Sequence, residues 1–154
     1  MFRFNSSILV KRPLADVWRI LADFPRVPEW EQGVVAVRQV TPGPPGVGTT
    51  LIARRVYLGC ETLVECLITE REELRGATMA LQGGPLRHAS VRYAVEPAGS
   101  EQTVVTYAAE GELCLALKVL TPFMPALGRA EAKQNLTNLK RLLEAPSLDD
   151  ALQT

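Results

Sequence analysis

The stretch that decides the fold is SILVKRPLADVWRILADFPRVPEW, which covers residues 7–30. It predicts the end of a β-strand, a helix that begins at Pro13, a break near Pro25 and a second short helix that ends near Trp30. A strand followed by two short helices cannot bury its apolar face locally. The rest of the chain must therefore provide a sheet and an element that covers it.

Alternation of apolar and polar residues predicts that sheet. Residues 2–11 alternate as expected of a half-buried strand. Six further strands are expected, and the short Gly- and Pro-rich connections between most of them are typical of an antiparallel meander. Their ranges are 34–40, 49–57, 60–72, 77–82, 86–97 and 102–113.

In the last part of the chain, the spacing of apolar residues changes from that of a strand to that of a helix. From Pro122 or Pro125 to Glu144, leucines recur at helical spacing, and Pro146 is expected to end this long helix. The sequence therefore predicts an α+β fold: a curved antiparallel sheet of about seven strands, with two short helices after the first strand, wrapped around a long C-terminal helix.

The length of the chain fits one domain. A chain of 154 residues can bury roughly 70% of its unfolded surface. We expect one domain over residues 1–154, with an ordered core of about 2–145 and a C-terminal tail at 146–154. No internal repeat or linker interrupts the sequence.

Charge and hydropathy narrow the classes of partner that we expect. Seventeen basic residues balance seventeen acidic ones, so nucleic acid is not an expected partner, nor does the net charge predict a basic stripe for anionic lipid. No stretch has the roughly 18 consecutive apolar residues of an integral membrane segment. The N-terminal residues do not resemble a signal peptide, and we expect a cytoplasmic protein.

The cysteines do not indicate a disulfide or a metal site. Cys60 and Cys66 are six residues apart on one predicted strand, which separates their Cα atoms by about 20 Å. A disulfide needs less than about 7 Å. With a single histidine, His88, and no cluster of Cys and His, neither a zinc site nor any other cofactor is expected.

Side-chain size along the C-terminal helix predicts a cavity. The second half of its apolar face has Leu136, Leu139 and Leu143, whereas Gly128 and Ala132 occupy the corresponding face earlier in the helix. Small residues opposite a concave sheet leave space that a ligand or water can fill. We therefore expect a pocket beneath the segment from Met124 to Ala132. Alternatively, Phe123, Met124 and the aromatic residues of the sheet fill this space.

Strand alternation selects further side chains for the cavity lining. Tyr93 and Tyr107 are expected to face inward, where each hydroxyl can bind a polar group of an apolar ligand or simply the backbone. Tyr57, Met79 and Leu81 are candidates from the middle strands.

Two questions of orientation follow. In the strand at 49–57, the face with Arg55 and the face with Arg54 mix apolar and polar residues about equally, so both stay open. In the strand at 86–97, alternation turns Arg87 inward and His88 outward. Arg87 could hold an anionic or enolate oxygen at the cavity mouth, or be a solvated charge at a strand end.

No catalytic residue is assigned. Glu110 and Glu112 share a face that is outward under the assignment of Tyr107, and no nucleophile motif or phosphate-binding glycine loop is present.

Five places in the sequence carry a resemblance to a known family. They are Ile8 with Arg12, Pro13, Val17 and Trp18; residues 21–30; residues 45–48; residues 93–97 with 103–106; and residues 136–144. Together they resemble the polyketide cyclase/dehydratase branch of the START-like (SRPBCC) superfamily. The resemblance implies the helix-grip fold with a cavity between sheet and C-terminal helix. It does not transfer any catalytic residue.

Three functions stay open. The first is binding or transport of a small hydrophobic molecule, such as a lipid, an isoprenoid or a polyketide-like aromatic, in that cavity. The second is a polyketide cyclase/dehydratase-type enzyme that orients a reactive chain, with Tyr93, Tyr107 or Arg87 as polar partners. The third is a groove for an apolar segment of a protein partner, which exposed residues around Phe123 and Val47 would favour. The oligomeric state is not predicted.

Overall fold

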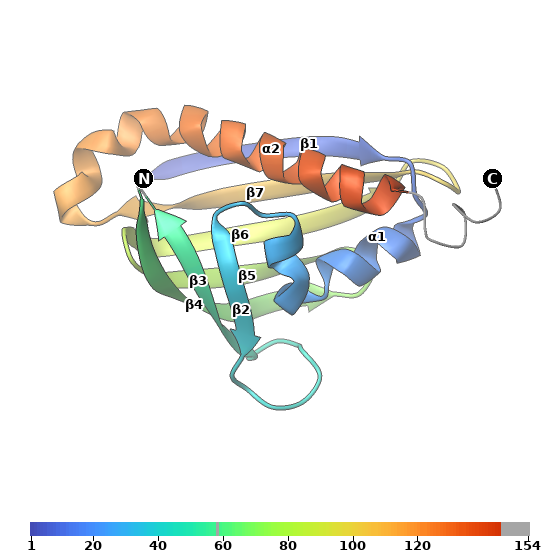
Figure 1. The fold of residues 1–154 in the computed structure, drawn as a ribbon, viewed down its shortest axis with the longest axis horizontal. Coiled ribbons are helices and arrows are strands. Elements are labelled where there is room, and N and C mark those ends of the chain that lie inside the picture. The colour runs from blue at the N-terminus through green and yellow to red at the C-terminus, as the bar shows by residue number, and fades with distance from the viewer. Residues whose placement is uncertain (58, 146–154) are drawn as a thin grey trace.

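The computed structural model describes residues 1–57 and 59–145 (Figure 1). In chain order the elements are β1 (Phe2–Val10), α1 (Leu14–Leu21), the 3-10 helix η1 (Phe24–Glu29), β2 (Val34–Gln39), β3 (Thr50–Tyr57), β4 (Cys60–Glu72), β5 (Gly76–Gly83), β6 (Leu86–Pro97), β7 (Thr103–Leu113), the 3-10 helix η2 (Leu115–Phe123) and α2 (Met124–Glu144). The predicted α+β class and the order of the strands are confirmed. The expected tail at 146–154 lies outside the described residues.

The seven strands form one antiparallel sheet in the order β1-β7-β6-β5-β4-β3-β2. From β2 to β7 the chain is a meander in which each strand pairs with the next. The first strand closes the opposite edge, where β1 pairs with β7 from Phe2 opposite Gly111 to Val10 opposite Thr103. The connection through α1 and η1 carries the chain across the concave face of the curved sheet (Figure 1).

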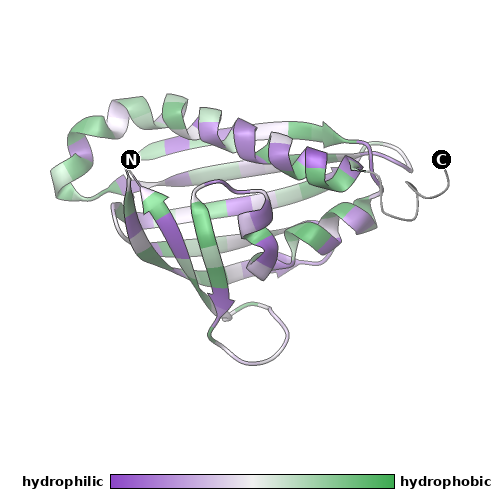
Figure 2. Cartoon of the chain, viewed as in Figure 1, coloured by the Kyte–Doolittle hydropathy of each residue, from purple (hydrophilic) through white to green (hydrophobic). Residues whose placement is uncertain are grey.

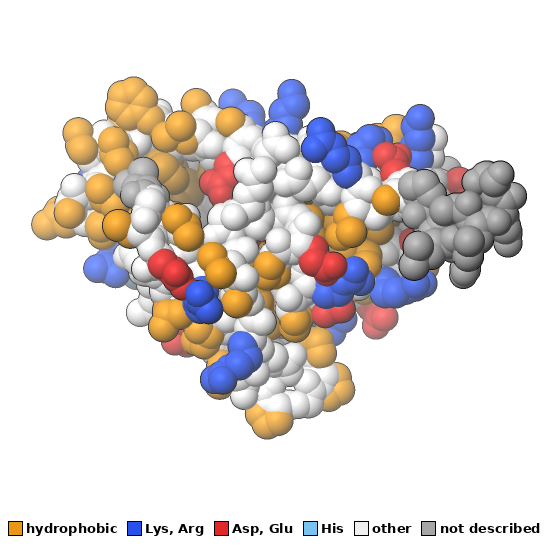
Figure 3. All heavy atoms as spheres, viewed as in Figure 1, with side chains coloured by type: hydrophobic (Ala, Val, Ile, Leu, Met, Phe, Trp, Pro, Cys, Tyr) orange, Lys and Arg blue, Asp and Glu red, His pale blue; other side chains and the backbone are white. Residues whose placement is uncertain are grey.

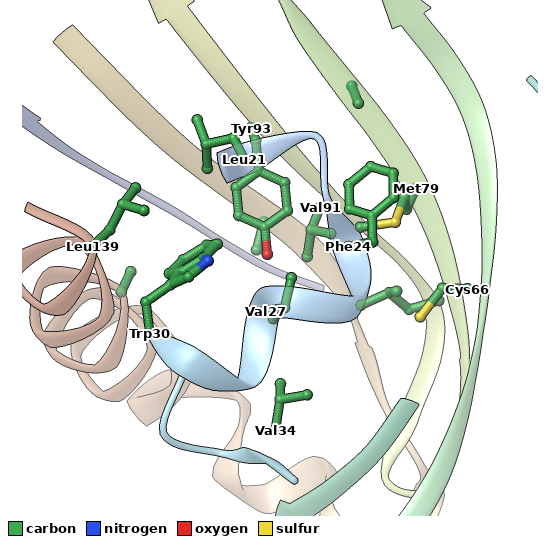
Figure 4. Close-up of a cluster of buried hydrophobic side chains, with 14 of the residues drawn as sticks. Leu21, Phe24, Val27, Trp30, Val34, Cys66, Met79, Val91, Tyr93 and Leu139 are labelled. Atoms are coloured by element: carbon green, nitrogen blue, oxygen red, sulfur yellow. The ribbon is translucent and has the colours of Figure 1, made fainter. Parts of the chain in front are cut away.

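The deciding stretch fills one half of that concave face. Phe24, Val27 and Trp30 from η1 and its end are buried, and they pack with Met79 and Tyr93 of the sheet (Figure 4). Pro25 and Pro28 keep this segment short and tightly wound. This half of the sheet is therefore closed by the chain's own side chains.

Helix α2 covers the other half along β1 and β7 (Figure 1). Polar and apolar stretches alternate along it, as expected of an amphipathic helix (Figure 2). Its C-terminal end is fastened to β1, because Lys140 Nζ donates to the Leu9 carbonyl at 2.8 Å and the Lys11 amide donates to Glu144 Oε1 at 3.0 Å. Leu136 and Leu139 are fully buried there.

The inward orientation predicted for Arg87 is wrong. An irregularity in the pairing of β6 with β7 lies between Arg87 and Ser90, and His88 has a φ of 49°. Such a bulge adds a residue to one strand and shifts the alternation of its side chains. Both Arg87 and His88 are therefore exposed, while Ala89 is buried.

Gly128 of α2 lies directly against the sheet. A Cβ atom at this position would lie 2.2–2.6 Å from ring atoms of Phe4. The Phe4 ring is itself held between Phe2 and Tyr107, with centroids 6.1 and 6.2 Å away. Glycine thus lets the N-terminal half of α2 rest directly on an aromatic ring of β1.

We expect Gly128→Ala to destabilise the protein by about 1–3 kcal/mol, although alanine favours an exposed helix by about 1 kcal/mol. The new methyl group must displace the Phe4 ring. Urea unfolding measures the loss, and adding Phe4→Leu should recover part of it. A Gly128→Ala protein as stable as the parent would contradict this packing.

Candidate functional site

A cavity of about 270 Å³ lies between the sheet, η2 and the N-terminal half of α2. Phe2, Phe4 and Tyr107 form its aromatic wall, and Leu117 and Leu120 of η2 line its outer end. The space-filling view shows apolar side chains gathered around η2 and the start of α2, beside a recess in the surface (Figure 3). We call this space the main cavity.

Six of the nine residues predicted for the lining do line the main cavity. They are Tyr57, Leu81, Tyr107, Met124, Gly128 and Ala132. Met79 and Tyr93 instead line a second space of about 40 Å³ beneath η1, and Arg87 lies outside both. Phe123 is 61% exposed and does not fill the main cavity.

The structure shows which face of β3 points toward the interior of the fold. Leu51 and Ala53 are buried, and Arg55 and Tyr57 continue the same inward face. Arg54 lies on the outer face, where its side chain pairs with Glu61. Strand β3 therefore places the cation of Arg55 on the inward face of the sheet.

Arg55 is the polar centre of the site. Its side chain is only 15% exposed, and its Nη2 atom lies 4.0 Å from Glu31 Oε2 and 3.8 Å from Glu131 Oε1. Both distances exceed that of a hydrogen bond. The Nε atom is buried and has no hydrogen-bond partner among the residues that the structure describes. The guanidinium also lies 5.3 Å from the centroid of the Tyr57 ring.

This arrangement keeps Arg55 charged. Burial lowers the pKa of Arg55, but the Glu31 carboxylate and nearby tyrosine hydroxyls raise it by more. Burial also raises the pKa of Tyr57 and Tyr107, so both stay neutral hydroxyls. The wall of the main cavity thus combines the Arg55 cation with neutral tyrosine hydroxyls and the carboxylates of Glu110 and Glu131, and the buried Nε–H of Arg55 has no partner among the described residues.

Glu31 lies behind Arg55, away from the main cavity, at the small space beneath η1. Its side chain is 4% exposed, and its Oε1 accepts a hydrogen bond from the Tyr93 hydroxyl. Burial raises the pKa of Glu31, while Arg55 and the Tyr93 hydroxyl oppose this shift only in part. The Tyr93 hydroxyl therefore stabilises the buried carboxylate of Glu31 by a hydrogen bond.

Two asparagines of α2 hold the loop that carries Glu31. Asn138 Nδ2 donates to the Trp30 carbonyl at 3.1 Å, and the Gln32 amide donates to Asn135 Oδ1 at 3.2 Å. These bonds fasten the residues on either side of Glu31 to the helix. Helix α2 therefore both covers the cavity and fixes the counter-ion of Arg55.

Sequence reasoning missed Glu31, Glu131 and Asn135, and it left Arg55 undecided. It also placed Glu110 on the outward face, whereas Glu110 contributes to the lining of the main cavity. One signal was present, because Tyr57 was a candidate for the lining and has the same strand parity as Arg55. No such signal marks Glu31, which follows a short 3-10 helix with no periodic pattern.

The described part of the chain gives little support for a reactive thiol, a metal site or a membrane-spanning helix. Burial raises the pKa of Cys66 to about 11, so its thiol stays protonated and unreactive. Within residues 1–57 and 59–145, no group of three His, Cys, Asp or Glu side chains could hold a metal ion. Nor does any helix among these residues have the length and apolarity needed to cross a membrane.

The chain belongs to the family described as polyketide cyclase / dehydrase and lipid transport, whose model matches residues 1–144. No curated protein matches its sequence. The match to the family model confirms the resemblance inferred from the sequence.

Solved structures share the fold at low identity. A START superfamily protein from Mycobacterium smegmatis has 17% identity over the whole of both chains, with a TM-score of 0.73. The aromatase/cyclase Zhui from Streptomyces sp. R1128 has 13% identity and a TM-score of 0.78, covering 92% of this chain and 93% of its own. A protein from Thermus thermophilus has 18% identity and a TM-score of 0.75, covering 94% of this chain and 99% of its own. The helix-grip fold is therefore established.

We expect Arg55→Met to destabilise the protein more at pH 8 than at pH 4. Without the cation, the pKa of Glu31 in the folded state rises further above its ordinary value of 4.5. Well below 4.5, Glu31 is protonated in the folded and the unfolded state of both proteins, and the extra loss is absent. It grows as the pH rises above the folded-state pKa of Glu31 in the parent protein and reaches its full size above the higher folded-state pKa in the variant. Urea unfolding should show a loss of about 2 kcal/mol or more at pH 8.

Arg54→Met is the matched control, because Arg54 is the neighbouring residue on the outer face of β3. Its half-exposed ion pair with Glu61 should contribute less than about 1 kcal/mol. An equal loss for Arg55→Met at both pH values would contradict the coupling between Arg55 and Glu31.

Proposed function

We propose that this protein binds a small, mainly apolar molecule in the main cavity and that Arg55 recognises an acceptor oxygen on it. The observation that carries the proposal is a charged, largely buried guanidinium on the cavity wall with an Nε atom that has no hydrogen-bond partner among the described residues. A buried donor without a partner is costly, and a ligand oxygen would remove that cost. Membership of the family supports a hydrophobic ligand-binding or cyclase role in general.

The dimensions of the cavity narrow the ligand class. About 270 Å³ is at the small end of ligand pockets. An aromatic ring system or a short isoprenoid with a carbonyl, phenolate or carboxylate group suits it better than a lipid with two acyl chains. The aromatic wall of Phe2, Phe4 and Tyr107 supports the same choice.

An enzyme of the cyclase/dehydratase type is the second candidate, and Arg55 is the observation that favours it. A guanidinium in a site that excludes water would stabilise the enolate that forms when a polyketide-type chain condenses with itself. However, the buried acid with the raised pKa, Glu31, lies behind Arg55 and not on the main cavity. Because an enzyme would need such a group within reach of its substrate, binding is the preferred function.

A groove for a protein segment has less support. Phe123 and Val47 are exposed, at 61% and 68%. They belong to η2 and to the loop between β2 and β3, which lie at different ends of the molecule (Figure 1). The cytoplasmic location and the independence from cofactors remain predictions.

Two fluorescent probes test the role of Arg55. N-phenyl-1-naphthylamine is neutral, and 8-anilinonaphthalene-1-sulfonate has the same rings with an added anionic group. We expect the parent protein to bind both. Arg55→Met should weaken the sulfonate about tenfold or more, since a hydrogen bond to a charged group is worth about 1.5–3 kcal/mol. It should change the affinity for the neutral probe by no more than about threefold.

Two variants serve as controls. Arg54→Met should bind both probes like the parent protein, whereas Ala132→Leu should weaken both because its side chain enters the cavity. The proposal fails if neither probe binds, or if Arg55→Met retains the parent affinity for the sulfonate.

A further inference from the structure

Helix η2 and the first turns of α2 are apolar on both sides. Toward the main cavity they present Leu117, Leu120 and Met124. Toward solvent they present Leu115, Val119, Phe123 and Leu127, which are 87%, 77%, 61% and 62% exposed; Leu127 also reaches the lining of the main cavity. We call these four residues the apolar rim. Solvated apolar side chains of this size in one short segment mark an interaction surface.

The apolar rim is convex and lies at one end of the molecule. Helix η2 extends past the ends of the strands (Figure 1), and apolar side chains gather on the surface there (Figure 3). No residue of η2 is buried. The rim therefore projects from the fold and does not form a groove that would hold a peptide.

The segment that carries the rim has charges of one sign. Within residues 113–130 the charged side chains are the exposed cations Lys118 and Arg129, while the nearest carboxylates along the cavity, Glu110 and Glu131, lie outside this segment. Neither Lys118 nor Arg129 forms an ion pair with another residue of the described part of the chain. The whole chain has no net charge, so the two cations are a local feature of this segment.

We propose that the apolar rim inserts into the surface of a lipid bilayer, with Lys118 and Arg129 among the headgroups. Exposed leucine and phenylalanine side chains beside basic residues are the composition of segments that bind in the plane of a membrane interface. A specific protein interface needs about one hydrogen bond per 100–200 Å². Among residues 115–127 only Lys118 and Thr121 have polar side chains, and a fluid hydrocarbon phase requires none.

This orientation would bring the outer end of the main cavity onto the membrane, because the inner side of the same segment lines that cavity. An apolar ligand could then pass between cavity and bilayer without crossing water. The docking itself does not depend on what the cavity holds.

Sedimentation with vesicles of phosphatidylcholine, with and without added phosphatidylserine, tests the proposal on the full chain. We expect binding that phosphatidylserine strengthens, and Val119→Glu combined with Phe123→Glu should weaken it about tenfold or more. Lys118→Ala combined with Arg129→Ala should remove the preference for phosphatidylserine. Leu63→Glu is the matched control, because Leu63 is 62% exposed on β4 and should not affect binding.

Three results would overturn the proposal. They are no sedimentation of the parent protein with either vesicle, equal binding by the rim variant, and a lipid-free dimer in analytical ultracentrifugation that the rim variant dissociates. The last result would assign the rim to a second copy of the chain. The rim variant should still bind N-phenyl-1-naphthylamine in solution, since Val119 and Phe123 do not line the cavity. Failure at the membrane is thus distinguishable from failure of ligand binding.

Discussion

The charge of Arg55 is held in an apolar interior, where an uncompensated cation would cost several kcal/mol. Glu31 and Glu131 lie 4.0 and 3.8 Å from it and supply negative charge, but neither is close enough to satisfy its N–H donors. Coulombic attraction persists at such distances in a medium of low dielectric constant, whereas a hydrogen bond does not. The protein therefore compensates the charge while the buried Nε donor has no partner among the described residues.

Helix α2 makes this arrangement possible because its two halves do different things. The C-terminal half packs large leucines and holds the loop of Glu31 through Asn135 and Asn138. The N-terminal half has Gly128 against the Phe4 ring and Ala132 above the cavity. The C-terminal half thus fixes the position of Glu31, and the N-terminal half leaves the cavity open beside Arg55. A uniformly large apolar face would close the cavity, and a uniformly small one would release the loop.

Much of the fold could be predicted from the sequence, since period-two alternation over long strands and a leucine pattern of helical period depend only on local burial. Predictions that needed tertiary information were less successful. Arg54 and Arg55 are adjacent, so charge could not decide which face of β3 is inward, and only the parity shared with Tyr57 pointed to the answer. The bulge beside His88 moved Arg87 outward, and no residue pattern announces such a shift. Glu31 was missed because its contacts are with Arg55 and Tyr93 of the sheet and because α2, more than 100 residues later in the chain, holds the residues on either side of it.

The most direct test of the account is the NMR signal of the Arg55 Nε–H group, assigned by its loss in Arg55→Met. A buried N–H without a partner should shift strongly downfield when 8-anilinonaphthalene-1-sulfonate binds and an oxygen accepts its hydrogen bond. The neutral N-phenyl-1-naphthylamine should move it much less. An Arg55 signal that stays in place while the sulfonate binds would contradict the claim that this arginine recognises the ligand.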